Sequence, residues 1–237
     1  MSITLTNIPT IMLAQRPVPW TEGATFLDRW FGSAATIKPF YGAADTVTVN
    51  MDWVLSFKRA RAVYDEMVSQ KVWANEAARG RLATILKRQG RLGRPGRAWF
   101  GDINLLVPKV HSDQVNFRYV TSPASPIDGL SAGLGDFALF AAVAGEHELL
   151  SNGKTKVYVH QVGIYVRDSF DFEGHQFLGY WNESKNSVSG LNPLSGTMVT
   201  NGDFRDWRKA SGKGGDFLIY SNMRKLMISP ADTFIIG

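Results

Sequence analysis

The chain of 237 residues contains no cysteine. Disulfide bonds, thiolate metal ligands and cysteine nucleophiles are therefore excluded, and the sequence indicates neither a reducing nor an oxidising compartment. Long apolar runs are also missing, since none approaches the roughly 20 residues of a membrane-spanning helix, and we expect no transmembrane segment. The first residues, MSITLTNIPT, carry no charge ahead of their apolar positions. We therefore expect synthesis in the cytoplasm without a conventional secretory signal.

Several familiar site motifs are missing as well. The four histidines show no His-x-x-x-His spacing, and no Gly-x-Ser-x-Gly string is present. The glycine-rich string SAGLGD lacks the lysine of a phosphate-binding loop. Zinc enzymes, serine hydrolases of the nucleophile-elbow type and P-loop proteins are therefore not predicted.

What is present is typical of a globular protein, with 44% apolar and 12% aromatic residues. Apolar residues recur at helical spacing over residues 52–68 and 75–90, and a shorter helix is predicted from Thr21 to Gly32. Beyond residue 99 the pattern predicts strands, over residues 115–120, 136–144, 156–167, 176–181 and 216–221, with one helix around 203–209. The string Ser151-Asn152-Gly153 favours a hairpin turn between two of these strands.

The predicted fold class is α+β, in which a helical N-terminal part packs on a curved antiparallel β-sheet in the C-terminal part. The predicted division is an arm, helical region and basic linker over residues 1–98, and a sheet-rich region over 99–237. The two parts are also compatible with one continuous domain.

The net charge of +5 is unevenly distributed. Residues 58–97 hold eleven basic and three acidic side chains, a local charge of +8. The end of this block is a predicted partner-binding patch made of Lys87, Arg88, Arg91, Arg94 and Arg97. Such a patch can attract an acidic protein or a membrane, and it is equally typical of a solvated helix face and loop. Because aromatic residues are not interleaved with it, no specific nucleic-acid partner is predicted.

The candidate site lies where a long alternating strand ends, at Arg167. Asp168, Asp171, Glu173 and His175 follow within eight residues. The three carboxylates are predicted ligands for a hard cation, Mg²⁺ or Ca²⁺. In a catalytic interpretation Asp168, Asp171 and His175 divide base, stabiliser and acid roles. The alternative is an acidic turn in which Asp171 accepts backbone N–H groups and His175 points to solvent.

Three strings together resemble an uncharacterised proteobacterial family of unknown function whose members are encoded near type VI secretion and polymorphic-toxin genes. They are MDWVLSFKRARAVYDEMV, IYVRDSFDFEGHQFLGYWNESKNSVS and LSGTMVTNGDFRDWRKASGKGGDFLIYSN. This resemblance implies an antibacterial effector or an accessory protein of the secretion apparatus. It also implies two partners: a secretion-tip protein and a cognate immunity protein.

A shorter stretch is similar to the motif of colicin M-type toxins, which is Asp-x-Tyr-Asp followed by five residues and His-Arg. Asp168-Ser169-Phe170-Asp171 and the later His175 match part of it. Phe170 stands in place of the tyrosine, three residues precede His175 instead of five, and Gln176 stands in place of the arginine. The similarity implies metal-dependent cleavage of a phosphate-bearing envelope precursor.

Three functional hypotheses follow, and the sequence leaves open whether the protein is an enzyme. The first is an antibacterial hydrolase effector that acts on a cell-envelope or phosphate-bearing substrate at the strand end. The second is a non-enzymatic cargo adaptor that binds a secretion-tip protein or a membrane through the basic helical region. The third is an accessory module in which the aromatic residues of FDFEGHQFLGYW only pin a loop to the core.

Overall fold

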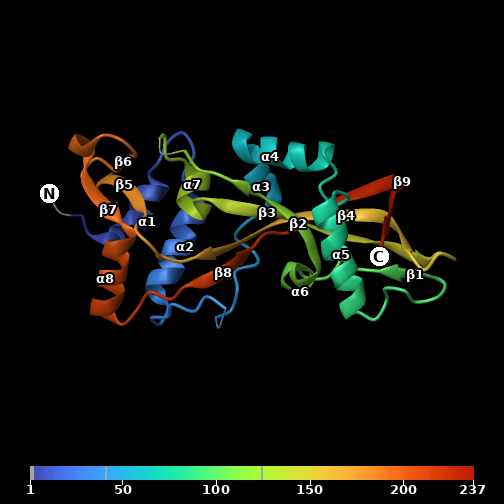
Figure 1. The fold of residues 1–237 in the computed structure, drawn as a ribbon. Coiled ribbons are helices and arrows are strands. Elements are labelled where there is room, and N and C mark those ends of the chain that lie inside the picture. Colours follow the sequence, from blue (N-terminus) through green and yellow to red (C-terminus); the bar gives the residue numbers. More distant parts are fainter. Residues whose placement is uncertain (1–2, 41, 124) are drawn as a thin grey trace. The chain divides into compact units, whose positions relative to one another are not determined.

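The computed structural model describes residues 3–40, 42–123 and 125–237 and combines helices with antiparallel strands (Figure 1). The predicted α+β class is confirmed. The helices are α1 (Ile8–Leu13), α2 (Thr21–Gly32), α3 (Met51–Ser56), α4 (Lys58–Ser69), α5 (Glu76–Arg88), α6 (Val107–Val110), α7 (Gly129–Leu134) and α8 (Asn201–Ser211). The strands are β1 (Arg97–Phe100), β2 (Gln114–Val120), β3 (Phe137–Leu149), β4 (Thr155–Phe170), β5 (Phe177–Asn182), β6 (Ser187–Ser189), β7 (Thr197–Thr200), β8 (Phe217–Tyr220) and β9 (Arg224–Ile236). In the described part of the chain, no helix is both long and apolar enough to cross a membrane.

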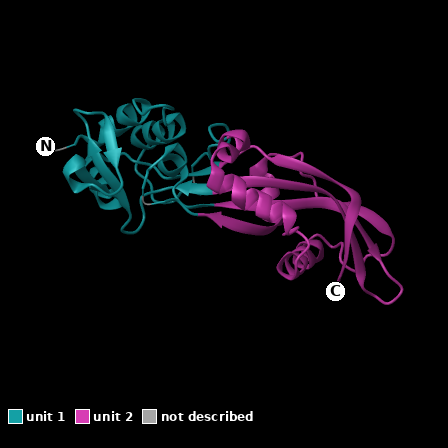
Figure 2. Ribbon diagram, turned by 90° about the horizontal axis from the view of Figure 1, so that it is seen from above, with its two compact units in different colours: residues 1–49, 121–137, 168–219 teal, residues 50–120, 138–167, 220–237 magenta. Residues whose placement is uncertain are grey.

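The chain divides into two compact units, each built from three separate segments (Figure 2). Unit 1 comprises residues 1–49, 121–137 and 168–219, and unit 2 comprises residues 50–120, 138–167 and 220–237. Residue 98 lies inside unit 2, and each unit contains helices and strands from both halves of the sequence.

The larger sheet has the strand order β1-β3-β4-β8, with β2 paired to β3 and β9 paired to β4. Its centre is the antiparallel hairpin of β3 and β4, whose register runs from Ala138 opposite Arg167 to Leu149 opposite Thr155. The predicted Asn-Gly turn closes this hairpin, and Gly153 takes a positive φ of 80° there. The register shifts after Ala144, where a Cβ on Gly145 would lie 2.0 Å from the Tyr158 carbonyl oxygen. Only glycine fits that close approach.

The helices of unit 2 follow the sequence pattern with one difference. The predicted helix over residues 52–68 is two helices, α3 and α4, because Phe57 between them has extended backbone angles of φ −88° and ψ 124°. Asn50 caps α3 by accepting a hydrogen bond from the Asp52 amide, and Asn75 caps α5 in the same way from the Ala78 amide. These caps fix where the two helices begin.

Unit 1 has an aromatic core between α2, α8 and the segment that follows β4. Trp30 on α2 is fully buried and packs edge-on against Phe172 and Phe204, whose rings stack 3.9 Å apart. A capping box between Thr200 and Asp203 sets the start of α8. A small antiparallel sheet of the order β6-β5-β7 completes the unit. The aromatic residues of this region thus pack into the core, as the accessory-module hypothesis requires, and they also position the loop beside them.

Candidate functional site

Strand β4 extends three residues beyond its predicted end. It runs to Phe170, so Asp168 is part of the strand, and only Asp171, Glu173 and His175 lie in the loop that follows. Asp168 is thereby held on a rigid element, whereas the other three depend on loop structure.

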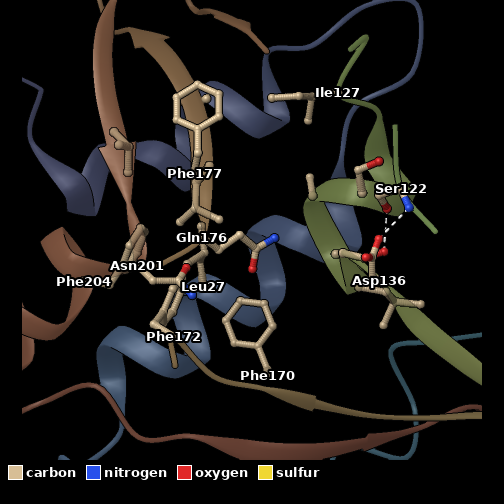
Figure 3. A pocket seen from close by; sticks show the side chains of 18 of the residues that line it. Leu27, Ser122, Ile127, Asp136, Phe170, Phe172, Gln176, Phe177, Asn201 and Phe204 are labelled. Carbon is tan, nitrogen blue, oxygen red and sulfur yellow. Dashed lines mark hydrogen bonds between the residues drawn. The ribbon is translucent and has the colours of Figure 1, made fainter. Parts of the chain in front are cut away.

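A pocket with a volume of about 580 Å³ lies beside this strand end, entirely within unit 1; we call it the Asp168 pocket (Figure 3). Its volume is in the range of small-molecule sites, which is roughly 300–1,000 Å³. Its apolar wall comes from the two N-terminal helices, α7, the end of β4, β5 and α8. These residues include Ile8, Met12, Leu27, Leu134, Phe170, Phe172, Phe177, Trp181 and Phe204.

Polar side chains from distant parts of the chain also line the pocket. They are Asp136, Asp168, Asp171, Ser122, Ser131, Ser169, Gln176 and Asn201. Figure 3 shows Ser122 and Asp136 on one side and Asn201 on the other, with the Gln176 side chain extending between them. The Gln176 amide nitrogen lies 3.8 Å from the position that a Cβ on Gly135 would take. The pocket therefore combines an apolar wall with polar groups, the usual composition of a ligand site.

Asp171 is oriented by its own loop. Its Oδ2 accepts a hydrogen bond of 2.6 Å from the Ser169 hydroxyl, and its Oδ1 accepts one of 3.1 Å from the Glu173 amide. This is the turn geometry of the alternative interpretation, and it coexists with a place in the pocket wall.

Asn201 is a lining residue that the sequence analysis missed. Its side chain is only 2% exposed, and its Nδ2 donates a 2.5 Å hydrogen bond to the Glu173 carbonyl oxygen. Its buried Oδ1 has no hydrogen-bond partner. A buried acceptor without a partner is uncommon in folded proteins and calls for an explanation. The only signal in the sequence is its position directly after the Thr200 cap, which does not reveal the pocket.

The structure brings together only part of the predicted site. Asp168 and Asp171 both line the pocket, while Glu173 and His175 are exposed and are not among its lining residues. Across the described ranges, no three His, Cys, Asp or Glu side chains are grouped so that they could hold a metal ion. The expected Mg²⁺ or Ca²⁺ ligands Asp168, Asp171 and Glu173 do not form such a group.

The predicted basic patch is partly neutralised within unit 2. Arg88 forms an ion pair with Asp113, and Arg97 forms one with Glu146 in which Nη2 and Oε2 are 2.6 Å apart. The Arg97 and His160 hydrogen bonds hold the pKa of the Glu146 carboxyl below its ordinary value. Arg91 donates to the Trp99 carbonyl oxygen, and Lys87 and Arg94 are exposed. Three of the five cations are thus engaged inside the unit.

Two histidines of unit 2 are held in their neutral form. Burial, together with nearby Arg167 and Arg81, lowers the pKa of His111 to about 4. Burial also lowers the pKa of His147, which is 1% exposed and whose ring nitrogens have no hydrogen-bond partner. Neither lies in the Asp168 pocket.

Comparison with known proteins places the chain in a family. The model of a family of unknown function, DUF6402, matches residues 3–198 and 195–236. The chain belongs to this family. Its membership confirms the resemblance to an uncharacterised family. No curated protein and no solved structure shows a significant match.

Proposed function

We propose that this member of the DUF6402 family is an antibacterial effector associated with type VI secretion and that the Asp168 pocket is its working site. The effector role is supported by the resemblance of the three strings to a family encoded near secretion and toxin genes. The observation that carries the choice of site is that Asp168 and Asp171, the two acidic residues singled out at the strand end, line one pocket of small-molecule size.

The proposed chemistry is hydrolysis of a cell-envelope substrate by the two carboxylates. Asp168 sits on the rigid end of β4, and Asp171 is held by two hydrogen bonds, so both have defined positions beside the pocket. Carboxylates in such positions serve as a general base and as a stabiliser of developing positive charge. His175 is exposed and outside the pocket, and we assign it no step.

A phosphate-bearing substrate is less well matched to this pocket than another envelope component. The described lining residues include three aspartates and no Lys, Arg or His. A phosphate group brought against this wall would meet like charges without a cation to offset them.

The test is bacterial growth with the chain expressed in the cytoplasm or exported by an added signal peptide. Asp168→Ala and Asp171→Ala are compared with His175→Ala, the matched control at an exposed position of the same loop. Circular dichroism confirms that each variant is folded. We expect toxicity only on export, its loss in both aspartate variants, and its retention in the His175 variant.

Two results would contradict the proposal. Toxicity that survives both aspartate substitutions would place the working site elsewhere. Lack of toxicity in either compartment, with soluble and correctly exported protein, would favour the cargo-adaptor hypothesis and binding of a secretion-tip protein.

A further inference from the structure

The hydrogen-bonding groups of the Asp168 pocket specify the chemistry of its ligand. The inference rests on the proposed function, because it takes this pocket as the working site. The described lining residues carry a formal side-chain charge of −3, from Asp136, Asp168 and Asp171, with no lining cation. In a site with apolar walls, such charges attract a cation and repel an anion more strongly than in bulk water.

The hydroxyl groups of the pocket already donate their protons within the protein. Ser122 Oγ donates to the Gly135 carbonyl oxygen, and Ser169 Oγ donates to the Asp171 carboxylate. Ser131 Oγ donates to the carboxylate of Asp128. Since each hydroxyl has a single proton, these three serines offer acceptors to a ligand.

Asn201 provides an independent observation. Its Nδ2 is used by the Glu173 carbonyl oxygen, and the group left without a partner is the acceptor Oδ1, on a side chain that is 2% exposed. Leaving a buried acceptor unpaired costs about 1–3 kcal/mol, which a ligand N–H or O–H group would recover. The unmet requirement at Asn201 is thus for a donor.

The apolar wall limits the rest of the ligand. Five aromatic side chains line the pocket: Phe170, Phe172, Phe177, Trp181 and Phe204. Aromatic faces attract cations and cover apolar surface. Acceptors, negative charge and aromatic rings in one pocket are the complement of an organic ammonium ion.

We propose that the Asp168 pocket binds an organic cation, a primary ammonium group attached to an apolar or aromatic body. In an envelope substrate the group recognised would be a free amine, and the aspartates would hold it while the apolar wall covers its carbon skeleton.

The test uses three probes of nearly equal size and different charge: 2-phenylethylammonium, neutral 2-phenylethanol and anionic 3-phenylpropionate. Binding to the whole protein is measured by isothermal titration calorimetry at pH 7 and low salt. We expect the ammonium to bind about tenfold more tightly than the alcohol and the carboxylate to bind most weakly. The outcome that refutes the proposal is binding of the carboxylate as tight as that of the ammonium.

Variants locate the binding. Asp136→Asn and Asp171→Asn are expected to weaken ammonium binding about tenfold while 2-phenylethanol binding stays unchanged, which shows that the pocket is intact. Asp28→Asn, at an exposed position of α2, is the matched control and leaves both affinities unchanged. Gln176→Glu adds an anion at an exposed lining position and is expected to tighten ammonium binding. Ammonium binding that ignores all three pocket substitutions overturns the inference.

The two proposals fail in different ways. Export-dependent toxicity without ammonium binding would leave the effector role and overturn the ligand class. Charge-selective ammonium binding without toxicity would support the ligand class and contradict the effector role.

Discussion

His111 makes unit 2 sensitive to mild acid. It lies in the one-turn helix His111–Asp113, and its Nδ1 is 3.1 Å from the Tyr165 hydroxyl. Its ring packs edge-on against Phe140, Tyr165 and Tyr220. Burial among these rings, with two arginines nearby, lowers the pKa of His111 to about 4. The folded protein therefore keeps this imidazole neutral at pH values where the unfolded chain protonates it.

The size of the effect follows from the two pKa values. In the unfolded chain the pKa is about 6.5, so the unfolded state binds the extra proton first as the pH falls. The stability contributed by neutral His111 is complete above about pH 6.5 and is lost progressively towards pH 4. Between pH 7 and pH 5 this amounts to a loss of about 2 kcal/mol in the free energy of unfolding.

Urea denaturation at pH 7 and pH 5, followed by circular dichroism, measures this loss. His111→Gln has no imidazole, and we expect its stability to fall by about 2 kcal/mol less than that of the natural protein over the same pH interval. His175→Gln, at an exposed position, controls for removal of a histidine as such. Equal losses in the natural protein and the His111 variant would refute the reasoning. So would a pKa at or above 6 for His111 in an NMR titration.

Two further predictions concern close packing. Asp216→Ala removes the 2.8 Å acceptor of Trp30 Nε1 and leaves the buried Arg208 without its anion, and we expect a loss of about 3–5 kcal/mol in a denaturation experiment; a loss below about 1 kcal/mol would contradict this. Gly145→Ala places a Cβ 2.0 Å from a β4 carbonyl oxygen and is expected to destabilise by about 3 kcal/mol, whereas Gly80→Ala in α5, with nothing within 4 Å, is expected to stabilise by about 0.5–1 kcal/mol. If the two glycine variants had equal thermal midpoints, the steric argument would fail.

The sequence predicted elements whose signals are local. The β3–β4 hairpin has alternating strands joined by an Asn-Gly turn, and α5 begins after a capping asparagine, so each could be placed from a few neighbouring residues. The strand β9 was missed, because its pairing with β4 shifts register between Val159 and Gln161 and its apolar residues do not alternate cleanly. His147 was misjudged as exposed between two glutamates, although strand alternation turns it inward and the glutamates outward.

The candidate site was predictable only where it is local. Asp168 and Asp171 stand out because they follow a strong strand pattern, and both line the pocket. Ser122, Asp136 and Asn201 come from segments tens of residues away and are assembled by tertiary packing, which no spacing in the sequence indicates. Conversely, His175 is close in sequence to Asp171 but exposed, because the loop turns it away from the pocket.

The three-segment construction of each unit has a consequence for how the chain folds during its synthesis. Helix α2 is complete at residue 32, but the last segment of unit 1 ends at residue 219. At 5–20 residues per second, a ribosome needs roughly 10–40 s to supply the missing partners. During that interval the apolar face of α2, which includes Phe26 and Trp30, has no complete core to enter and is open to chaperones. A single cut at any point between residues 50 and 219 would divide at least one unit, so separate production of the units requires rejoining segments.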